Sequence, residues 1–258
     1  MTVLKKIPAA AIAGCLSAVI VASGVNAAEI TIVSSPNVQP ALDAIIPLFE
    51  HASGHTIAIT YKSTPVWTTQ VDAGPPVDLA IAYTDTLDRL VSTGKVASGL
   101  RRDILRSGIG VAVRAGAPKP DISSVEALKN TLLSAKSVAF STGPTGVYLA
   151  TVMERLGIAE QLKAKTILTN SGIGAVGAAV AKGDVEIGIH GIYELAPVAG
   201  LDLVGPIPAD LQKMMVYSAV VPVNAKEPEG AKELMNFLSS EIAIPLLGKQ
   251  GLQPRSPD

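Results

Sequence analysis

Four short clusters of Ser, Thr, Asn and Gly are the parts of this sequence whose side chains best suit a chemical role. Each cluster follows an apolar, β-branched run and precedes a stretch with helical spacing of apolar residues. Hydroxyl groups and the free N–H groups of a helix start can hold an ionised ligand, and the helix dipole attracts negative charge there. The clusters are Ser34-Ser35-Pro36-Asn37, Ser63-Thr64-Pro65, Ser141-Thr142-Gly143-Pro144-Thr145-Gly146 and Asn170-Ser171-Gly172-Ile173-Gly174.

Each cluster has an alternative explanation in helix capping, because Ser, Thr and Asn are the usual N-cap residues. Ligands of open α/β sheets, however, bind at the carboxyl ends of the strands, where all four clusters fall. Two clusters lie in each half of the chain. Together they favour one shared site for a small anion over four unrelated caps.

Other polar residues at strand ends are further candidates for this site. Arg106 and Ser107 precede a long apolar strand, and an arginine there could bind a carboxylate or oxyanion with two hydrogen bonds, or else lie solvated on the surface. His190 ends another apolar strand and is either a ligand contact or a hydrogen-bonded core histidine. Tyr83 and Tyr193 also follow strands and could offer hydroxyl groups.

No catalytic or metal-binding set accompanies these residues. The sequence has no G-x-S-x-G motif and no paired base and nucleophile. A G-x-G-x-x-G match at 172–177 precedes only a short helix, and Gly54 interrupts the zinc-like spacing of His51 and His55. We therefore expect a binding protein rather than an enzyme, with no cofactor and no metal.

The elements that must position these clusters alternate between strands and helices. This alternation predicts an α/β fold with mostly parallel sheets flanked by helices. The ranges expected as strands are 29–33, 56–61, 77–82, 107–114, 137–140, 166–168, 185–189 and 217–223. The ranges expected as helices are 38–51, 66–73, 147–156, a short helix ending at Lys182, and 228–238.

The order of these elements predicts two lobes. Residues 28–107 and 218–258 would form lobe 1, and residues 108–217 would form lobe 2. Two strands that cross between the lobes would act as a hinge, with the ligand held between the lobes.

The N-terminus has the pattern of a secretory signal peptide at 1–27. Two lysines precede an apolar run from Ile7 to Val21, and Val25-Asn26-Ala27 offers a cleavage site. The expected location is therefore periplasmic. A lipidated form at Cys15, which ends a lipobox-like Ile12-Ala13-Gly14-Cys15, is the alternative. Cys15 is the only cysteine, so cleavage after Ala27 would exclude disulfides and thiolate chemistry.

Composition narrows the class of ligand and partner. Aromatic residues make up only 3% of the chain, which argues against a pocket that stacks on sugars. The formal net charge is −1, and no basic stripe is present, so nucleic acid is not an expected partner.

Three segments resemble a known family. They are Ile30-Thr31-Ile32-Val33-Ser34-Ser35, Gln70-Val71-Asp72-Ala73-Gly74-Pro75-Pro76-Val77-Asp78-Leu79 and Gly143-Pro144-Thr145-Gly146-Val147-Tyr148. They resemble the molybdate-binding periplasmic proteins, the solute receptors of ABC importers, over nearly all of 29–253. The resemblance implies a two-lobed periplasmic binding protein fold of type II, a small anion as ligand, a membrane permease as partner, and a monomer.

The resemblance also implies which residues hold the anion. The family uses a serine at each of the first two clusters, backbone amides at the next two, and a tyrosine. Carried over by position, the serines fall at Asn37 beside Ser34 and Ser35, and at Thr64 beside Ser63. The amides fall at Thr145 and near Ile173, and the tyrosine falls at about Gly191, beside His190 and Tyr193.

Three departures from the family leave the ligand open. Asn37 replaces a serine, Gly191 replaces the tyrosine, and Arg106 stands where the family tends to have a small residue. An uncharged set suits a tetrahedral oxyanion such as molybdate or tungstate, which we expect. An added arginine and histidine would suit a small di- or tricarboxylate, bound for transport or for sensing.

Overall fold

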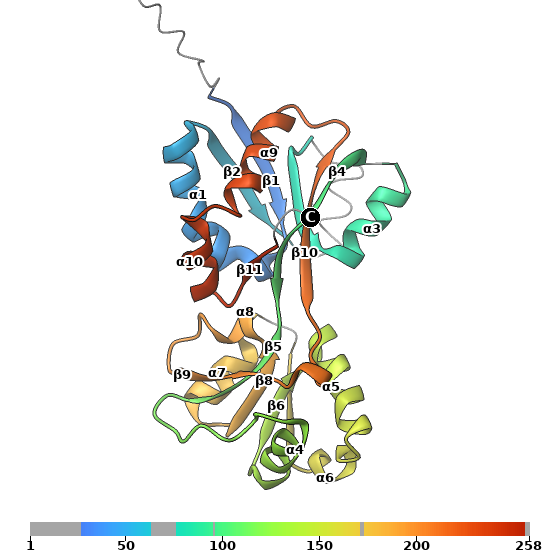
Figure 1. Cartoon of the computed structure of the whole chain (residues 1–258), viewed down its shortest axis with the longest axis vertical. Coiled ribbons are helices and arrows are strands. Elements are labelled where there is room, and N and C mark those ends of the chain that lie inside the picture. The colour runs from blue at the N-terminus through green and yellow to red at the C-terminus, as the bar shows by residue number, and fades with distance from the viewer. Residues whose placement is uncertain (1–26, 63–75, 95, 171–172, 256–258) are drawn as a thin grey trace, which may run out of the picture.

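The computed structural model of the chain describes residues 27–62, 76–94, 96–170 and 173–255. These residues form two α/β lobes stacked along the long axis and joined at a narrow waist (Figure 1). Each lobe is built on one sheet, one with six strands and the other with five. The two-lobed α/β fold expected from the sequence is therefore confirmed.

Lobe 1 contains both ends of the described chain. Its sheet has the strand order β11-β4-β10-β3-β1-β2. The strands are β1 (Glu29–Ser34), β2 (Thr56–Tyr61), β3 (Leu79–Tyr83), β4 (Val96–Ser107), β10 (Met215–Pro222) and β11 (Gln253–Pro254). The helices are η1 (Pro36–Val38), α1 (Gln39–Ser53), α3 (Thr84–Ser92), α9 (Pro228–Phe237) and α10 (Ala243–Lys249).

Lobe 2 is formed by the middle of the chain, and its sheet has the strand order β7-β6-β8-β5-β9. The strands are β5 (Ile109–Arg114), β6 (Val138–Ser141), β7 (Thr166–Thr169), β8 (Ile187–Gly191) and β9 (Leu201–Pro206). The helices are α4 (Val125–Ser134), α5 (Pro144–Arg155), α6 (Ala159–Lys163), α7 (Ala175–Lys182), α8 (Ile192–Leu195) and η2 (Ala209–Leu211).

The expected parallel pairing holds in only one part of each sheet. Strands β2, β1 and β3 are parallel in lobe 1, and β7, β6 and β8 are parallel in lobe 2. The strands nearest the waist pair antiparallel, namely β10 with β3 and β4, and β5 with β8 and β9. Parallel strands need a helical crossover to return the chain, whereas a strand that comes back from the other lobe can pair antiparallel.

Each sheet is covered on both faces, which explains why its central strands read as nearly continuous apolar runs. In β1, Ile30 and Ile32 pack into the large core beneath α1, α9 and α10, while Val33 packs on the opposite face against α3. In lobe 2 the larger core lies beneath α4, α5 and α6, and a smaller one lies beneath α7. The carboxyl ends of the parallel strands are thereby fixed.

The waist is formed where the chain passes from one sheet to the other. The strand expected at 107–114 corresponds to β5 alone, and its first residue, Ser107, ends β4, because pairing changes from lobe 1 at Ser107 to lobe 2 at Ile109. The Gln212 side chain fixes this passage. Its Oε1 accepts from Ile109 N at 2.6 Å, and its Nε2 donates to Ile109 O at 2.9 Å. The exact lobe boundaries at 107/108 and 217/218 stay a prediction.

The sequence patterns miss several short elements. They overlook α3, α4, α6, α8, the edge strands β9 and β11, and all of the long strand β4 except Ser107, and they begin α5 three residues too late. The helix expected at 66–73 and most of the signal peptide lie outside the described residues.

Candidate functional site

A chain of hydrogen-bonded side chains joins the two lobes at the waist. Asn37 Nδ2 lies 2.8 Å from the Tyr83 hydroxyl, which lies 2.6 Å from the Tyr193 hydroxyl. The Tyr193 hydroxyl in turn lies 2.9 Å from Glu194 Oε1. Asn37 and Tyr83 belong to lobe 1, whereas Tyr193 and Glu194 belong to α8, which follows the lobe 2 strand β8.

The donors in this chain all point the same way when Glu194 is ionised. A carboxylate only accepts, so the Tyr193 hydroxyl donates its proton to Glu194. Tyr193 then accepts from the Tyr83 hydroxyl, and Tyr83 accepts from Asn37 Nδ2. A contiguous series of hydrogen bonds therefore runs from half-buried Asn37 and Tyr83 to the buried carboxylate of Glu194.

The other oxygen of Glu194 faces lobe 2. Oε2 accepts from the backbone N–H of Gly174 at 3.3 Å and lies 3.5 Å from His190 Nδ1. His190 Nε2 lies 2.9 Å from Ser141 Oγ. Because a bare Nδ1 would face a carboxylate, the favoured tautomer has its proton on Nδ1 and accepts from Ser141 at Nε2.

Burial sets the protonation states in this network. It raises the pKa of Glu194 above its ordinary value, while hydrogen bonds from Tyr193 and Gly174 partly oppose the rise. It lowers the pKa of His190 to about 4, so that the imidazole is neutral at pH 7. It also raises the pKa of Tyr83 and of Tyr193, so both phenols stay protonated.

The position of Asn37 follows from the first Ser–Asn cluster. The backbone N–H of Ser35 donates to the carbonyl of Ile81, which ties the end of β1 to β3. Ser35 Oγ then accepts from the backbone N–H of Asn37 at 3.4 Å and begins η1. This N-cap turns the chain so that the Asn37 side chain meets Tyr83, which ends β3.

The position of Tyr193 is fixed from several sides. Ser107 Oγ accepts from the Tyr193 N–H at 3.2 Å and donates to the carbonyl of Gly251 at 2.7 Å. The Tyr217 ring packs edge-on against Tyr193, with centroids 5.8 Å apart. A Cβ on Gly191 would lie 2.2 Å from the Tyr193 ring. The Tyr193 ring lies directly against Gly191, the position to which the family comparison assigned the tyrosine.

The structure thus brings four of the predicted site residues into or against one network. These four are Ser35, Asn37, His190 and Tyr193, and a fifth predicted residue, Ser107, supports Tyr193. Ser34 is fully buried, and its Oγ donates to the carbonyl of Ser35 at 3.2 Å. Its role is local.

The third cluster lies at the start of α5, beside Ser141. Thr142 is exposed, whereas Thr145 and Gly146 are buried. A Cβ on Gly146 would lie 1.6 Å from the carbonyl oxygen of Ser141, so only glycine allows α5 to begin so close to β6. Ile173 is 47% exposed. It precedes Gly174, the N-cap residue of α7, which has a φ of 70°.

Two groups of predicted residues stand apart from the network. Arg106 is exposed, while its neighbours Leu105 and Ser107 are buried, as expected for alternate residues of a strand. The structure therefore brings Ser107 into the network and leaves Arg106 out of it. Ser63 and Thr64 lie outside the described residues.

Sequence reasoning assigns no role to Glu194. The only sequence feature that relates Glu194 to the site is its spacing. It lies four residues after His190 and directly after Tyr193, and a short turn brings all three side chains together. Tyr83 and Ser141 directly follow predicted strands, which is the general signal for residues at such an edge.

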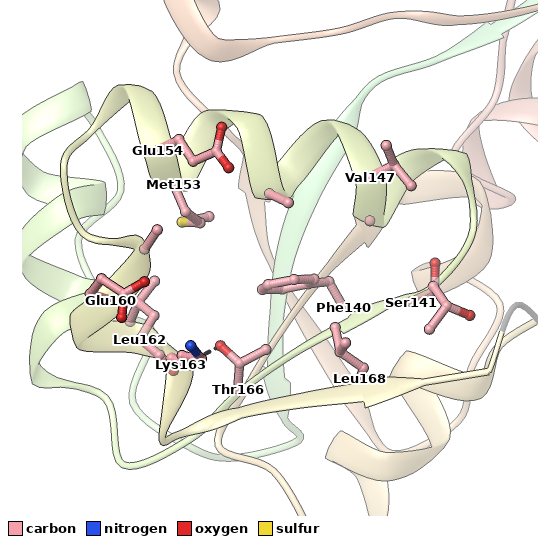
Figure 2. A pocket seen from close by; sticks show the side chains of 14 residues that line it. Phe140, Ser141, Val147, Met153, Glu154, Glu160, Leu162, Lys163, Thr166 and Leu168 are labelled. Carbon is pink, nitrogen blue, oxygen red and sulfur yellow. Dashed lines mark hydrogen bonds between the residues drawn. The ribbon is translucent and has the colours of Figure 1, made fainter.

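A pocket of about 530 Å³ in lobe 2 begins beside Ser141. Figure 2 shows Ser141 and Val147 at one end, and Glu154 and Glu160 at the other, with Phe140 between them. Lys163 also lines the far end, so that end carries charges of both signs. The end next to Ser141 offers a hydroxyl group and adjoins the start of α5.

The described residues lack both a membrane-spanning helix and a metal-binding cluster. No described helix has the length and apolar content needed to cross a membrane. In the same ranges no three His, Cys, Asp or Glu side chains gather in a way that could hold a metal ion.

Comparison with known proteins places the chain among solute-binding proteins. The chain is 35% identical over 231 residues to an aconitate isomerase from a Pseudomonas species, covering 87% of each chain. It is 24% identical over 242 residues to the molybdate-binding protein ModA of Azotobacter vinelandii, covering 92% of this chain and 94% of ModA. The crystallised molybdate-binding protein of the same species superposes with a TM-score of 0.65 at 20% identity, over 89% of this chain and 100% of the other. Residues 30–253 match the model of the bacterial extracellular solute-binding proteins, and the chain belongs to that family.

Proposed function

We propose that this protein captures a small organic polycarboxylate between its two lobes outside the cytoplasmic membrane and delivers it to a membrane permease of an ABC importer. The main support for this ligand class is the buried carboxylate of Glu194, which ends the series of hydrogen bonds that begins at Asn37. A site for a fully ionised oxyanion needs donors, and this network directs its donors inward to Glu194.

An unused position of the network supports a ligand that carries hydrogen atoms. The Asn37 amide oxygen is an acceptor on a half-buried residue. Molybdate has no hydrogen to offer it at neutral pH, whereas a polycarboxylate presents C–H or O–H groups beside its charges. Donors for those charges are available from the hydroxyl and amide groups at the start of α5, a 12-residue helix.

Lys62 supplies a positive charge at the same edge of lobe 1. Its backbone N–H donates to the carbonyl of Ser34 at 3.0 Å, one residue beyond the end of β2, and its side chain is half-buried. An ammonium group there would pair with one carboxylate of the ligand. The similarity to aconitate isomerase at 35% identity supports the same ligand class.

Calorimetric titration and thermal unfolding of the mature protein test the ligand class. We expect trans-aconitate or citrate to bind, and at about 100 times Kd to add about 2.7 kcal/mol of stability. Lys62→Gln should weaken that binding by about tenfold, whereas Arg106→Ala, which removes an exposed cation outside the network, should not. Binding of micromolar molybdate or tungstate, with no binding of any polycarboxylate, would refute this proposal in favour of the oxyanion.

Isomerisation of the bound ligand is a second candidate function. The family consists of binding proteins, but the relative at 35% identity is named an isomerase. In this chain a buried Glu194 with a raised pKa stands beside a neutral His190, an arrangement typical of sites that move protons.

The remaining aspects of the proposal follow the family. Its members bind solutes outside the cytoplasm, which supports secretion with cleavage after Ala27. We propose a monomer that closes on its ligand and then meets the permease. A membrane sensor in place of the permease would use the same closure.

A further inference from the structure

We propose that Tyr83, Tyr193 and Glu194 form a proton relay that shifts a hydrogen between two carbons of an unsaturated polycarboxylate held between the lobes. The inference rests on the proposed ligand class and assigns residues to the second candidate function. In this relay Tyr83 is the catalytic residue, because it is the member that touches the ligand, and Tyr193 and Glu194 act through it.

The geometry of the three oxygens fits a relay. The Tyr83 and Tyr193 hydroxyls lie 2.6 Å apart, and the Tyr193 hydroxyl lies 2.9 Å from Glu194 Oε1, both within normal hydrogen-bond distance. Tyr83 is half-buried, whereas Tyr193 and Glu194 are only 3% and 9% exposed. The partly exposed end is the one that a ligand can reach, and the other two members are shielded from water.

The proton transfer balances without any other reagent. The Tyr83 oxygen takes a proton from a CH2 group next to the double bond, its own proton passes to Tyr193, and the Tyr193 proton passes to Glu194. The C–H electron pair spreads over the double bond and the neighbouring carboxylate. The reverse shift returns a proton to the far carbon of the allylic unit, so the double bond moves by one position and nothing is oxidised or reduced.

Asn37 supports the half-buried end of this relay. Its Nδ2 group donates to the Tyr83 oxygen at 2.8 Å and lies 3.4 Å from the Tyr193 oxygen. These contacts fix both phenols in line and stabilise negative charge as it develops on their oxygens. Asn37 is therefore a positioning residue for Tyr83.

The surroundings of Glu194 keep it ready to take up a proton. His190 Nδ1 from β8 and the N–H of Gly174, the N-cap residue of α7, face its second oxygen, while Tyr193 faces the first. His190 is neutral, so it adds no full positive charge that would hold Glu194 ionised at low pH. Burial raises the pKa of Glu194, which brings it closer to the range in which a general base is effective.

Hydrogen exchange in D2O tests the relay. The mature protein is incubated with trans-aconitate, and proton NMR follows the loss of its CH2 signal and the appearance of the cis isomer. We expect exchange by the wild-type protein. Glu194→Gln and Tyr193→Phe should each lower the exchange rate by about 10²- to 10⁴-fold. Calorimetry on the same samples should show affinities for trans-aconitate that stay close to that of the wild type.

Two variants serve as matched controls. Tyr61→Phe removes a phenol that donates to Asp43 on the surface of the same lobe, and Glu229→Gln removes an exposed carboxylate paired with Lys232. Both should exchange at the wild-type rate. Thermal unfolding of every variant identifies any that fails to fold, and Tyr193→Phe tests the relay even if Glu194→Gln is unstable.

The pH profile separates a relay from a structural role of Glu194 as the partner of Gly174. With Glu194 ionised as the proton acceptor, the wild-type rate should fall as the pH drops through its raised pKa. The Glu194→Gln variant should not show this fall in rate at low pH.

Three results would overturn the relay. Binding of trans-aconitate without exchange by the wild type would refute it and leave the receptor proposal intact. Exchange by Glu194→Gln at the wild-type rate would refute it as well. Absence of polycarboxylate binding would refute both proposals.

Discussion

At the scale of single residues, the network at the waist contains two ionisable groups, and burial shifts their pKa values in opposite directions. His190 is 4% exposed and Glu194 is 9% exposed, and Nδ1 of one lies 3.5 Å from Oε2 of the other. Burial disfavours the charged form of each. It therefore lowers the pKa of His190 and raises the pKa of Glu194.

The lowered pKa of His190 predicts a loss of stability in mild acid. Its folded-state pKa of about 4 lies below the unfolded value of 6.5, so its contribution is complete above pH 6.5 and is lost as the pH falls towards 4. We expect the contribution of His190 to the free energy of unfolding to decrease by about 3 kcal/mol over that range. Urea unfolding at a series of pH values measures the decrease.

His190→Gln should flatten the acid side of that profile, whereas His51→Gln, at an exposed position, should leave it unchanged. Glu194 has the opposite sign, because a raised folded pKa stabilises the protein as the pH falls. Glu194→Gln should therefore steepen the acid loss. An unchanged slope in His190→Gln would contradict the assignment.

The sequence predicts some of these residues and not others for a physical reason. Asn37, His190 and Tyr193 end predicted strands or begin helices, so local pattern alone places them near the edge of a sheet. Glu194 lies in the four-residue helix α8, too short to give a periodic pattern. Its position depends on contacts with Tyr193 and Gly174, and the sequence around it does not reveal them.

At the scale of elements, the junction of β6 and α5 shows how tightly the site is built. Gly146 lies in the first turn of α5, and its Cα faces the carbonyl oxygen of Ser141. That approach places the start of the helix against the end of the strand, where Ser141 meets His190. A side chain at Gly146 would push the two elements apart.

Substitution of two helical glycines by alanine tests this packing. In Gly146→Ala the new Cβ would lie 1.6 Å from a backbone oxygen, so we expect a loss of about 1–3 kcal/mol or more in unfolding free energy, together with weaker ligand binding. In Gly248→Ala, on α10, the new Cβ meets nothing within 4 Å. That variant should be neutral or up to about 1 kcal/mol more stable. Equal effects in both would show that the junction tolerates movement.

The strength of the apolar pattern explains which elements the sequence predicts. Strand β1 and helix α1 have long, strongly patterned apolar sets that pack into one core, and both are found close to their predicted ends. Strand β9 has half-buried residues on most of its length and lacks clear alternation. Its pairing with β5 is decided by the neighbouring strand, so its own residues predict little.

At the scale of the whole molecule, the two lobes are joined by few contacts, which centre on Tyr193 of α8, a residue that packs into the core of lobe 1. The Asn37 and Ser107 side chains reach Tyr193 of α8, and the Ile192 N–H donates to the carbonyl of Gly108 at 2.9 Å. Ligand contacts on both lobes would add to this small number. Rigid rotation about the crossing strands, rather than a change within either lobe, is therefore the motion the architecture favours.

Small-angle X-ray scattering of the mature protein tests this rotation. We expect saturating trans-aconitate to reduce the radius of gyration, because both lobes gain contacts with one ligand. Gln212→Ala removes both hydrogen bonds that hold Ile109 where the chain enters lobe 2, and should lower the free energy of unfolding by about 1–3 kcal/mol. With that passage loosened, the lobes should sample a wider range of orientations and give a larger radius of gyration without ligand. Tyr148→Phe, which removes a hydrogen bond to Leu211 within lobe 2, should leave that radius unchanged. A radius that does not respond to ligand, in a protein shown by calorimetry to bind it, would mean that the lobes are already closed and that binding selects no new orientation.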